Sequence, residues 1–238
     1  RSIAGPRQAT ALIETVDRLI SDYPDHADSA GLAGIRAMLV RYRASVVYGE
    51  IGLAATLDAA IAECRAGAAA FEALHLPDNP EDAADVLAEG ALATLRRARK
   101  ALKQSRESGQ TEDFHELRKA VKTHAAHLSL LRRLWPSPVK PRRERVDLLG
   151  ESLGELHDVF VMRALIDARE APFDGLEPKL LVKLLKRSEK ALRKLCLAAA
   201  EELFEDKPRR TVRRLARKCR ADLAEAVVMP EPEGTPGE

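Results

Sequence analysis

The stretch from residue 114 to residue 135 constrains the fold most, because its polar and apolar residues recur with the period of an α-helix. Its sequence is FHELRKAVKTHAAHLSLLRRLW. One face of such a helix gathers cations and a histidine, at positions His115, Arg118, Lys119, Lys122 and Arg133. The opposite face is apolar and carries Phe114, Leu117, Val121, Leu128, Leu131 and Trp135. The pattern predicts a helix that buries one face in a core and presents a row of positive charge to an anion.

Local signals predict where this helix ends. Asp113 is expected to be the N-cap, with Glu116 three residues later in the position of a capping box. Trp135 is followed by Pro136, which lacks the backbone donor that a helix interior needs. We therefore expect residues 136–143, with the sequence PSPVKPRR, to form a cationic loop.

The rest of the chain predicts an all-α fold built of antiparallel helical bundles. Alanine, leucine, arginine and glutamate dominate, and no run of alternating β-branched residues is present. Further helices are expected over residues 8–23, 30–44, 51–74, 81–107, 144–169, 179–205 and 209–227. Two prolines mark a break before residue 81. We expect an acidic helical portion over residues 1–80, a basic helical portion over residues 81–228 and a disordered acidic tail over residues 229–238.

The formal net charge of +2 conceals a strong asymmetry along the chain. Residues 1–90 hold 7 basic and 14 acidic side chains, whereas residues 179–220 hold 15 basic and 5 acidic ones. A basic second half in a chain that is nearly neutral overall indicates a local anion-binding site rather than a general polycation.

Other predicted helices also carry cations at helical spacing. Arg96, Lys100 and Lys103 form a stripe on the helix that precedes His115, and an antiparallel pairing would bring both basic stripes to a common groove. Two stripes nearer the C-terminus comprise Lys183, Lys186 and Lys190, and Arg210, Arg213, Arg214 and Arg217. Long basic helices are often only solvated surfaces, so for these later stripes a ligand-binding role and a purely solvated face both stay open.

Composition excludes several classes of function. Aromatic residues make up 4% of the chain, which leaves few platforms for stacking nucleic-acid bases. No apolar run of about 18 residues predicts a membrane span, and the first residues lack the apolar core of a signal peptide. Cys64, Cys196 and Cys219 are widely spaced and are expected to be buried free thiols in a reducing cytosol. No glycine-rich phosphate loop, H-E-x-x-H motif or nucleophile motif is present, so we expect a cytoplasmic binding protein, not an enzyme, without metal or cofactor.

Two motifs resemble the second repeat of the CHAD domain, the conserved histidine α-helical domain. The first is His115-x-x-Arg118-Lys119-x-x-Lys122, and the second is Leu153-Gly154-x-Leu156-His157-Asp158 followed by Val161-x-Arg163. The resemblance implies a fold of two similar helical halves whose basic and histidine residues bind inorganic polyphosphate, and it places the protein on polyphosphate granules in the cytoplasm. Residues 3–12 align weakly with residues 153–162, so the first repeat is expected to be incomplete, with its basic helix preceding Arg1.

Together, the residues and the resemblance predict a polyphosphate site. Its expected members are His115, Arg118, Lys119, Lys122, Arg96, Lys100, Lys103, Arg133, Arg163, Lys183, Lys186 and Lys190. Asp158 is expected to orient His157 or Arg118 without touching the ligand. His124 lies on the apolar side and is predicted to be a core histidine, whereas the position of His127 fits either role.

Three alternatives stay open at this stage. The charged face of residues 114–135 could be a solvated surface with ion pairs to Glu112, Glu116 and Glu155. The dipeptide His157-Asp158 is also found in metal-dependent HD phosphohydrolases, which here would need His115, His124 or His127 as a further ligand. A nucleic-acid-binding helical protein is the third alternative, and the scarcity of aromatic residues argues against it for single strands.

Overall fold

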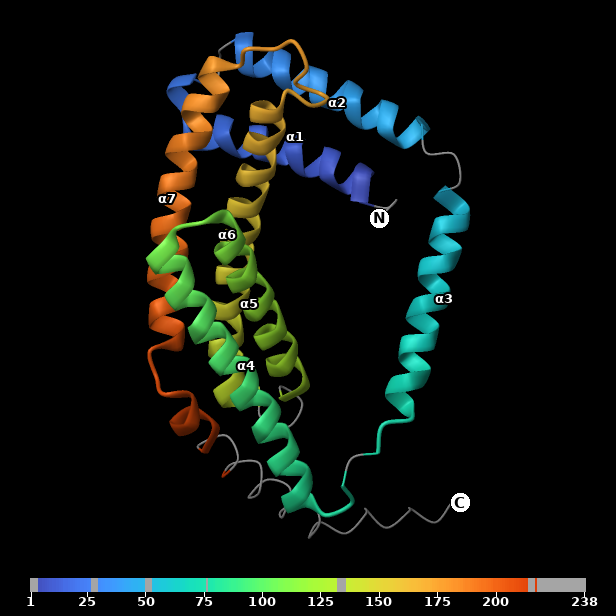
Figure 1. Ribbon diagram of the computed structural model, residues 1–238, viewed down its shortest axis with the longest axis vertical. Coiled ribbons are helices and arrows are strands. Elements are labelled where there is room, and N and C mark those ends of the chain that lie inside the picture. The colour runs from blue at the N-terminus through green and yellow to red at the C-terminus, as the bar shows by residue number, and fades with distance from the viewer. Residues whose placement is uncertain are drawn as a thin grey trace, which may run out of the picture. The chain divides into compact units, whose positions relative to one another are not determined.

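The computed structural model describes residues 4–26, 30–49, 53–75, 77–131, 136–213 and 217, and the regular structure in these ranges is entirely helical. The elements are α1 (Ala4–Asp22), η1 (Pro24–His26), α2 (Ala30–Gly49), α3 (Leu53–Glu72), α4 (Pro80–Ser108), α5 (Thr111–Leu131), α6 (Pro136–Ala168) and α7 (Lys179–Phe204) (Figure 1). The predicted all-α class is confirmed. Arg133, Trp135, Arg214, Cys219 and the predicted acidic tail lie outside the described residues.

The chain forms two compact units, and neither is a single stretch of sequence. Unit 1 comprises Arg1–Leu74 and Ser152–Leu195, and unit 2 comprises His75–Glu151 and Cys196–Glu238. Helices α6 and α7 each contribute one segment to each unit. The expected boundary near residue 80 lies close to the start of unit 2, but the expected basic portion is divided between the two units.

The core of unit 1 is built from apolar residues at helical spacing on four helices. In α1 these are Leu12, Val16 and Leu19, whose side chains are at most 1% exposed. They join a cluster that also contains Leu32 and Leu39 of α2, Val159 and Met162 of α6, Phe173, and Leu181, Leu184 and Leu185 of α7. Each fully buried leucine of this kind contributes about 1.5–3 kcal/mol to folding. Helix α3 differs, because nearly all of its described side chains are exposed to solvent. The expected burial of the cysteines is therefore wrong for Cys64 on α3, whereas Cys196 is buried.

The core of unit 2 confirms the predicted apolar face of α5. Phe114, Leu117, Val121 and Leu128 are at most 3% exposed. Also buried in unit 2 are Ala98 and Ala101 of α4, Val146 and Leu149 of α6, and Cys196, Ala200, Leu203 and Phe204 at the end of α7. Alanine on α4 removes side-chain bulk and lets neighbouring helices approach its backbone closely.

The turn between α4 and α5 corrects the predicted helix start. Gly109 has a φ of 63°, a left-handed conformation that glycine adopts without strain and that commonly ends a helix. Its N–H donates to the carbonyl oxygen of Ser105 at 3.1 Å, and the N–H of Gln110 donates to Ser108 Oγ at 3.0 Å. Helix α5 therefore begins at Thr111, and Asp113 lies in its first turn instead of at the N-cap. A carboxylate in the first turn is stabilised by the helix dipole, which is why the same residue suits either position.

The predicted cationic loop over residues 136–143 is wrong, because α6 begins at Pro136. A proline at the start of a helix removes an N–H that would have no intrahelical acceptor, so it costs little there. Pro141 stands inside the helix and forgoes one backbone hydrogen bond. Val139 is 2% exposed, and its burial favours a helix that already begins at Pro136.

Candidate functional site

The charged face of α5 points away from the core of unit 2, as predicted. His115, Lys119 and Lys122 are exposed, and Arg118 is half-buried at the edge of the core. Lys119 forms an ion pair with Glu116 one turn before it, which is one of the pairs expected for a solvated surface. The charged face therefore includes Lys119, which is paired with an acid of its own helix, and Arg118, which is partly buried.

Arg118 carries a buried donor that nothing in the described part of the chain satisfies. Its Nε is buried and has no hydrogen-bond partner among the described residues. Leaving a buried donor unsatisfied costs about 1–3 kcal/mol. An acceptor brought by a ligand, such as a phosphate oxygen, would recover part of that cost.

A second cationic surface of unit 2 is a groove of about 600 Å³ between α4 and the end of α7. Four cations of α4 line it, namely Arg99, Lys100, Lys103 and Arg106. The α7 side supplies Glu201, Phe204 and Glu205. Lys100 and Lys103 are predicted site residues and are exposed here, whereas Arg96 is exposed on the same helix outside the lining.

Arg99 and Arg106 are groove residues that the sequence analysis missed. Arg99 Nη1 donates to the carbonyl oxygens of Glu205 at 3.3 Å and Asp206 at 3.0 Å. Arg106 Nη1 lies 3.5 Å from Glu201 Oε1. Both contacts join α4 to a segment about a hundred residues away, so only their basic character was visible in the sequence.

In unit 2, the basic stripe of α4 lies on a different side of the helix from its hydrogen bonds with α5. Helix α4 meets α5 through Thr94, whose Oγ1 lies 3.0 Å from His127 Nδ1, and through Ser105, whose Oγ donates to the carbonyl oxygen of Asp113 at 2.9 Å. At about 100° per residue, Thr94 and Ser105 lie on the far side of α4 from Lys100. Packing therefore turns the α4 stripe away from α5 and toward the end of α7.

His124 is buried, in agreement with its predicted place in the core, at 3% exposure. Its Nε2 accepts a hydrogen bond from Arg142 Nε at 3.1 Å. Burial, with the charges of Arg142 and His127 as further causes, lowers the pKa of His124 to about 3. His127 is half-buried and is held by Thr94, so neither histidine lies on the cationic face of α5.

In unit 1, the predicted ligand residue Arg163 is committed to an internal ion pair. Arg163 of α6 pairs with Glu189 of α7, and Arg193 Nε lies 2.9 Å from the other oxygen of the same carboxylate. The guanidinium of Arg193 also covers the ring of Phe160, 4.8 Å from its centroid. Lys183, Lys186 and Lys190 are exposed on α7. Arg163 thus joins two helices, while the three lysines stay available to an anion.

His157 and Asp158 lie together in unit 1 on α6. His157 Nδ1 is 3.4 Å from Asp158 Oδ1, and Arg18 Nη2 of α1 is 3.6 Å from Asp158 Oδ2. The acid thus has Arg18 as a partner that the sequence analysis did not name. Over the described residues, no three or more histidine, cysteine, aspartate or glutamate side chains gather in a way that could hold a metal ion.

The family model described as the CHAD domain matches residues 1–167, well over half of the chain. The chain belongs to the CHAD domain family. The CHAD match includes α4 and α5 with all of their predicted site residues, whereas α7 with Lys183, Lys186 and Lys190 lies beyond it. No curated protein and no solved structure matches this CHAD protein significantly. No helix in its described part combines the length and hydropathy needed to cross a membrane.

Proposed function

We propose that this CHAD-domain protein is a cytoplasmic, non-enzymatic binder of inorganic polyphosphate, associated with polyphosphate granules. The observation that carries the proposal is Arg118, whose buried Nε has no acceptor among the described residues while its helix presents His115, Lys119 and Lys122 to solvent. Polyphosphate carries about one negative charge per phosphate and supplies only oxygen acceptors. Arginine can pair with two such oxygens at once, which makes it the strongest single contact on this face.

Successive turns of α5 suit a linear polyanion. Residues one turn apart are separated by about 5.4 Å along the helix, so Arg118 and Lys122 offer cations at intervals along a bound chain. Lys119 is expected to exchange its pair with Glu116 for phosphate, at small cost because exposed ion pairs are worth about 0–1 kcal/mol.

The groove lined by α4 and the end of α7 supports the proposal as a further cationic surface. Lys100 and Lys103 are exposed on its α4 wall, where Lys103 has only a surface ion pair with Glu107, and both are proposed to contact phosphate directly, with Arg96 next to them on α4. Arg99 and Arg106 hold the end of α7 and shape the groove. Lys183, Lys186 and Lys190 of unit 1 are proposed as additional contacts for long chains.

The test replaces Arg118 and Lys122 together by alanine and measures polyphosphate affinity by isothermal titration calorimetry. We expect affinity to fall by about tenfold or more, because two charge-assisted contacts are lost. The matched control is Arg43→Ala with Arg65→Ala, which removes the same charge from exposed positions on α2 and α3. Unchanged affinity in the Arg118 and Lys122 variant, or an equal loss in the control, would contradict the assignment.

A chelator arm tests the non-enzymatic part of the proposal. We expect no release of phosphate from polyphosphate and no change in affinity when EDTA is added. Phosphate release that stops with chelator would instead identify a metal-dependent phosphohydrolase.

A further inference from the structure

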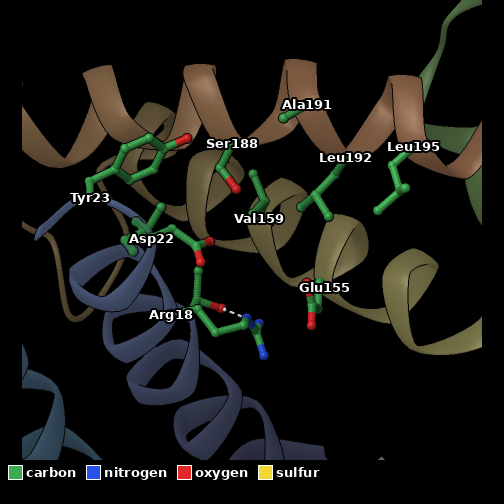
Figure 2. A pocket seen from close by; sticks show the side chains of 11 residues that line it. Arg18, Asp22, Tyr23, Glu155, Val159, Ser188, Ala191, Leu192 and Leu195 are labelled. Atoms are coloured by element: carbon green, nitrogen blue, oxygen red, sulfur yellow. Dashed lines mark hydrogen bonds between the residues drawn. The ribbon is translucent and has the colours of Figure 1, made fainter. Parts of the chain in front are cut away.

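Unit 1 contains a pocket of about 260 Å³ that the proposed polyphosphate site does not use. It is enclosed by α1, α6 and α7, and it is lined by Thr15, Arg18, Leu19, Asp22, Tyr23, Glu155, Val159, Ser188, Ala191, Leu192 and Leu195 (Figure 2). The α7 wall and Leu19 are largely apolar, and two carboxylates stand among the α1 and α6 residues. This volume suits a ligand of a few carbon atoms with polar ends.

The charges that line the pocket leave it acidic. Arg18 lies 3.6 Å from Asp158, so its charge is offset by an acid outside the lining. Arg18 Nη2 also donates to Thr15 Oγ1 at 3.2 Å, the bond drawn in Figure 2. Asp22 is exposed and Glu155 is half-buried, and neither forms an ion pair with a described residue; the nearby Arg18 pairs with Asp158. Two carboxylates thus remain uncompensated beside an apolar surface.

Ser188 supplies an independent sign that the pocket takes a ligand. It is 8% exposed, and its hydroxyl makes no hydrogen bond to the described residues. In Figure 2 the hydroxyl projects from α7 into the space between Tyr23 and Val159. The Tyr23 ring on that side is covered by the guanidinium of Arg187, 4.9 Å from its centroid, which fixes the ring at the pocket edge. Ser188 is almost buried, but its hydroxyl lines the pocket and has no protein partner among the described residues, so a ligand in the pocket can bond to it.

We propose that this pocket binds a small aliphatic diamine. Its two ammonium groups would pair with Asp22 and Glu155, one of them also donating to Ser188, and its carbon chain would lie against Leu19 and Leu192. An anion is disfavoured by the two carboxylates, and a purely apolar ligand would leave the Ser188 hydroxyl unsatisfied. The diamine satisfies the charge, the hydroxyl and the apolar wall together.

The experiment titrates the full chain with 1,4-diaminobutane by isothermal titration calorimetry, at low salt and without polyphosphate, which would itself bind the amine. We expect saturable binding at one site, weaker binding of butylamine and none of butyrate. Glu155→Gln is expected to weaken diamine binding by about tenfold, and Ser188→Ala by about fivefold, from the loss of a charged and a neutral hydrogen bond respectively.

Matched controls separate this site from general attraction to an acidic surface. Glu63→Gln changes the same charge on exposed α3 of unit 1, and Ser45→Ala removes an exposed hydroxyl on α2. Both controls should bind the diamine like the parent protein. The proposal is overturned if Glu63→Gln weakens binding as much as Glu155→Gln, if Ser188→Ala has no effect, or if butylamine binds as tightly as the diamine. Circular dichroism of each variant checks that the fold is intact, so that a loss of binding can be told from unfolding.

Discussion

At His124 the protein holds a neutral imidazole in the core of unit 2, directly against an arginine. Because Nε2 accepts from Arg142, the ring proton is assigned to Nδ1, which is buried without a partner among the described residues. The sequence placed His124 on the apolar side of its helix. It could not identify Arg142, which comes from another helix 18 residues later. Helical period predicts which way a side chain points, whereas the group it meets depends on how helices pack.

The lowered pKa of His124 makes folding sensitive to acid. Between pH 6.5 and about 3, the unfolded chain takes up a proton at this residue that the folded chain does not, so stability falls as pH falls. From pH 7 to pH 5 the expected loss from this residue is about 2 kcal/mol, at roughly 1.36 kcal/mol per pH unit. Urea unfolding at the two pH values should show this loss in the parent protein and not in His124→Gln. His75→Gln, at an exposed position, should behave like the parent; an identical pH dependence in His124→Gln would show that another group is responsible.

Two leucines of α5 provide a matched test of its orientation. Leu128 is 2% exposed and Leu130 is 54% exposed. Leu128→Ala should lower the free energy of unfolding by about 2–5 kcal/mol through lost contacts and a residual cavity. Leu130→Ala should change it by less than about 0.5 kcal/mol. Chemical denaturation measures both free energies of unfolding. Comparable losses of stability in the two variants would show that the orientation assigned to α5 is wrong.

At the scale of the element, periodicity predicted all seven α-helices of the described residues, and it placed both ends of α4 and α7 within one residue but misplaced the starts of α5 and α6. Helix α5 starts three residues before the predicted Phe114, and α6 starts eight residues before the predicted Glu144. In both cases, the start depends on contacts outside the local signal: the Ser108 hydroxyl for α5 and the buried Val139 for α6. Capping residues and prolines are compatible with more than one helix start, so the starts predicted from the sequence at Phe114 and Glu144 were wrong.

The pairing of α6 with α7 depends on one carboxylate. Glu189 is 12% exposed and holds both Arg163 and Arg193. Glu189→Gln should lower the free energy of unfolding by about 1.5–3 kcal/mol, because two partly buried guanidinium groups lose a charged acceptor. Glu177→Gln is the control, since its pair with Lys179 is exposed and should contribute less than about 1 kcal/mol. If both variants lose the same free energy of unfolding in urea, the structural role assigned to the ion pair of Arg163 is contradicted.

At the scale of the whole molecule, charge is the property that the sequence predicted most directly. Most of the proposed polyphosphate contacts come from short stretches of α4 and α5, and apart from the half-buried Arg118 they are exposed, as the sequence pattern predicts. The groove that contains Lys100 could not be predicted, because its other wall is the end of α7. The sequence also could not predict which helical segments make up each unit, because this depends on pairings between distant helices.

Salt dependence tests how many cations engage polyphosphate together. A bound polyanion releases condensed counterions, and for nucleic acids log affinity falls with log salt by about 0.7 per contact for single strands and about 0.9 for duplex DNA. Engagement of four to six among Arg96, Lys100, Lys103, Arg118, Lys119 and Lys122 predicts a slope on the order of −3 to −5 by that scaling. Affinity measured from low to high salt should give this slope in the parent protein. The slope should be shallower by about 2 in the variant with Arg118 and Lys122 both replaced by alanine. A slope near zero would show that polyphosphate is not held by a row of charges.

The interleaving of the two units also has a consequence for how the protein is made. The core of unit 1 needs Leu181, Leu184 and Leu185, and the core of unit 2 needs Ala200, Leu203 and Phe204, all from α7. At about 5–20 residues per second, α7 is synthesised on the order of ten seconds after α2. During that interval, the apolar faces of α1 and α5 have no α7 to cover them. A nascent chain that stalls before Lys179 should therefore be a substrate for chaperones, whatever the stability of the finished protein.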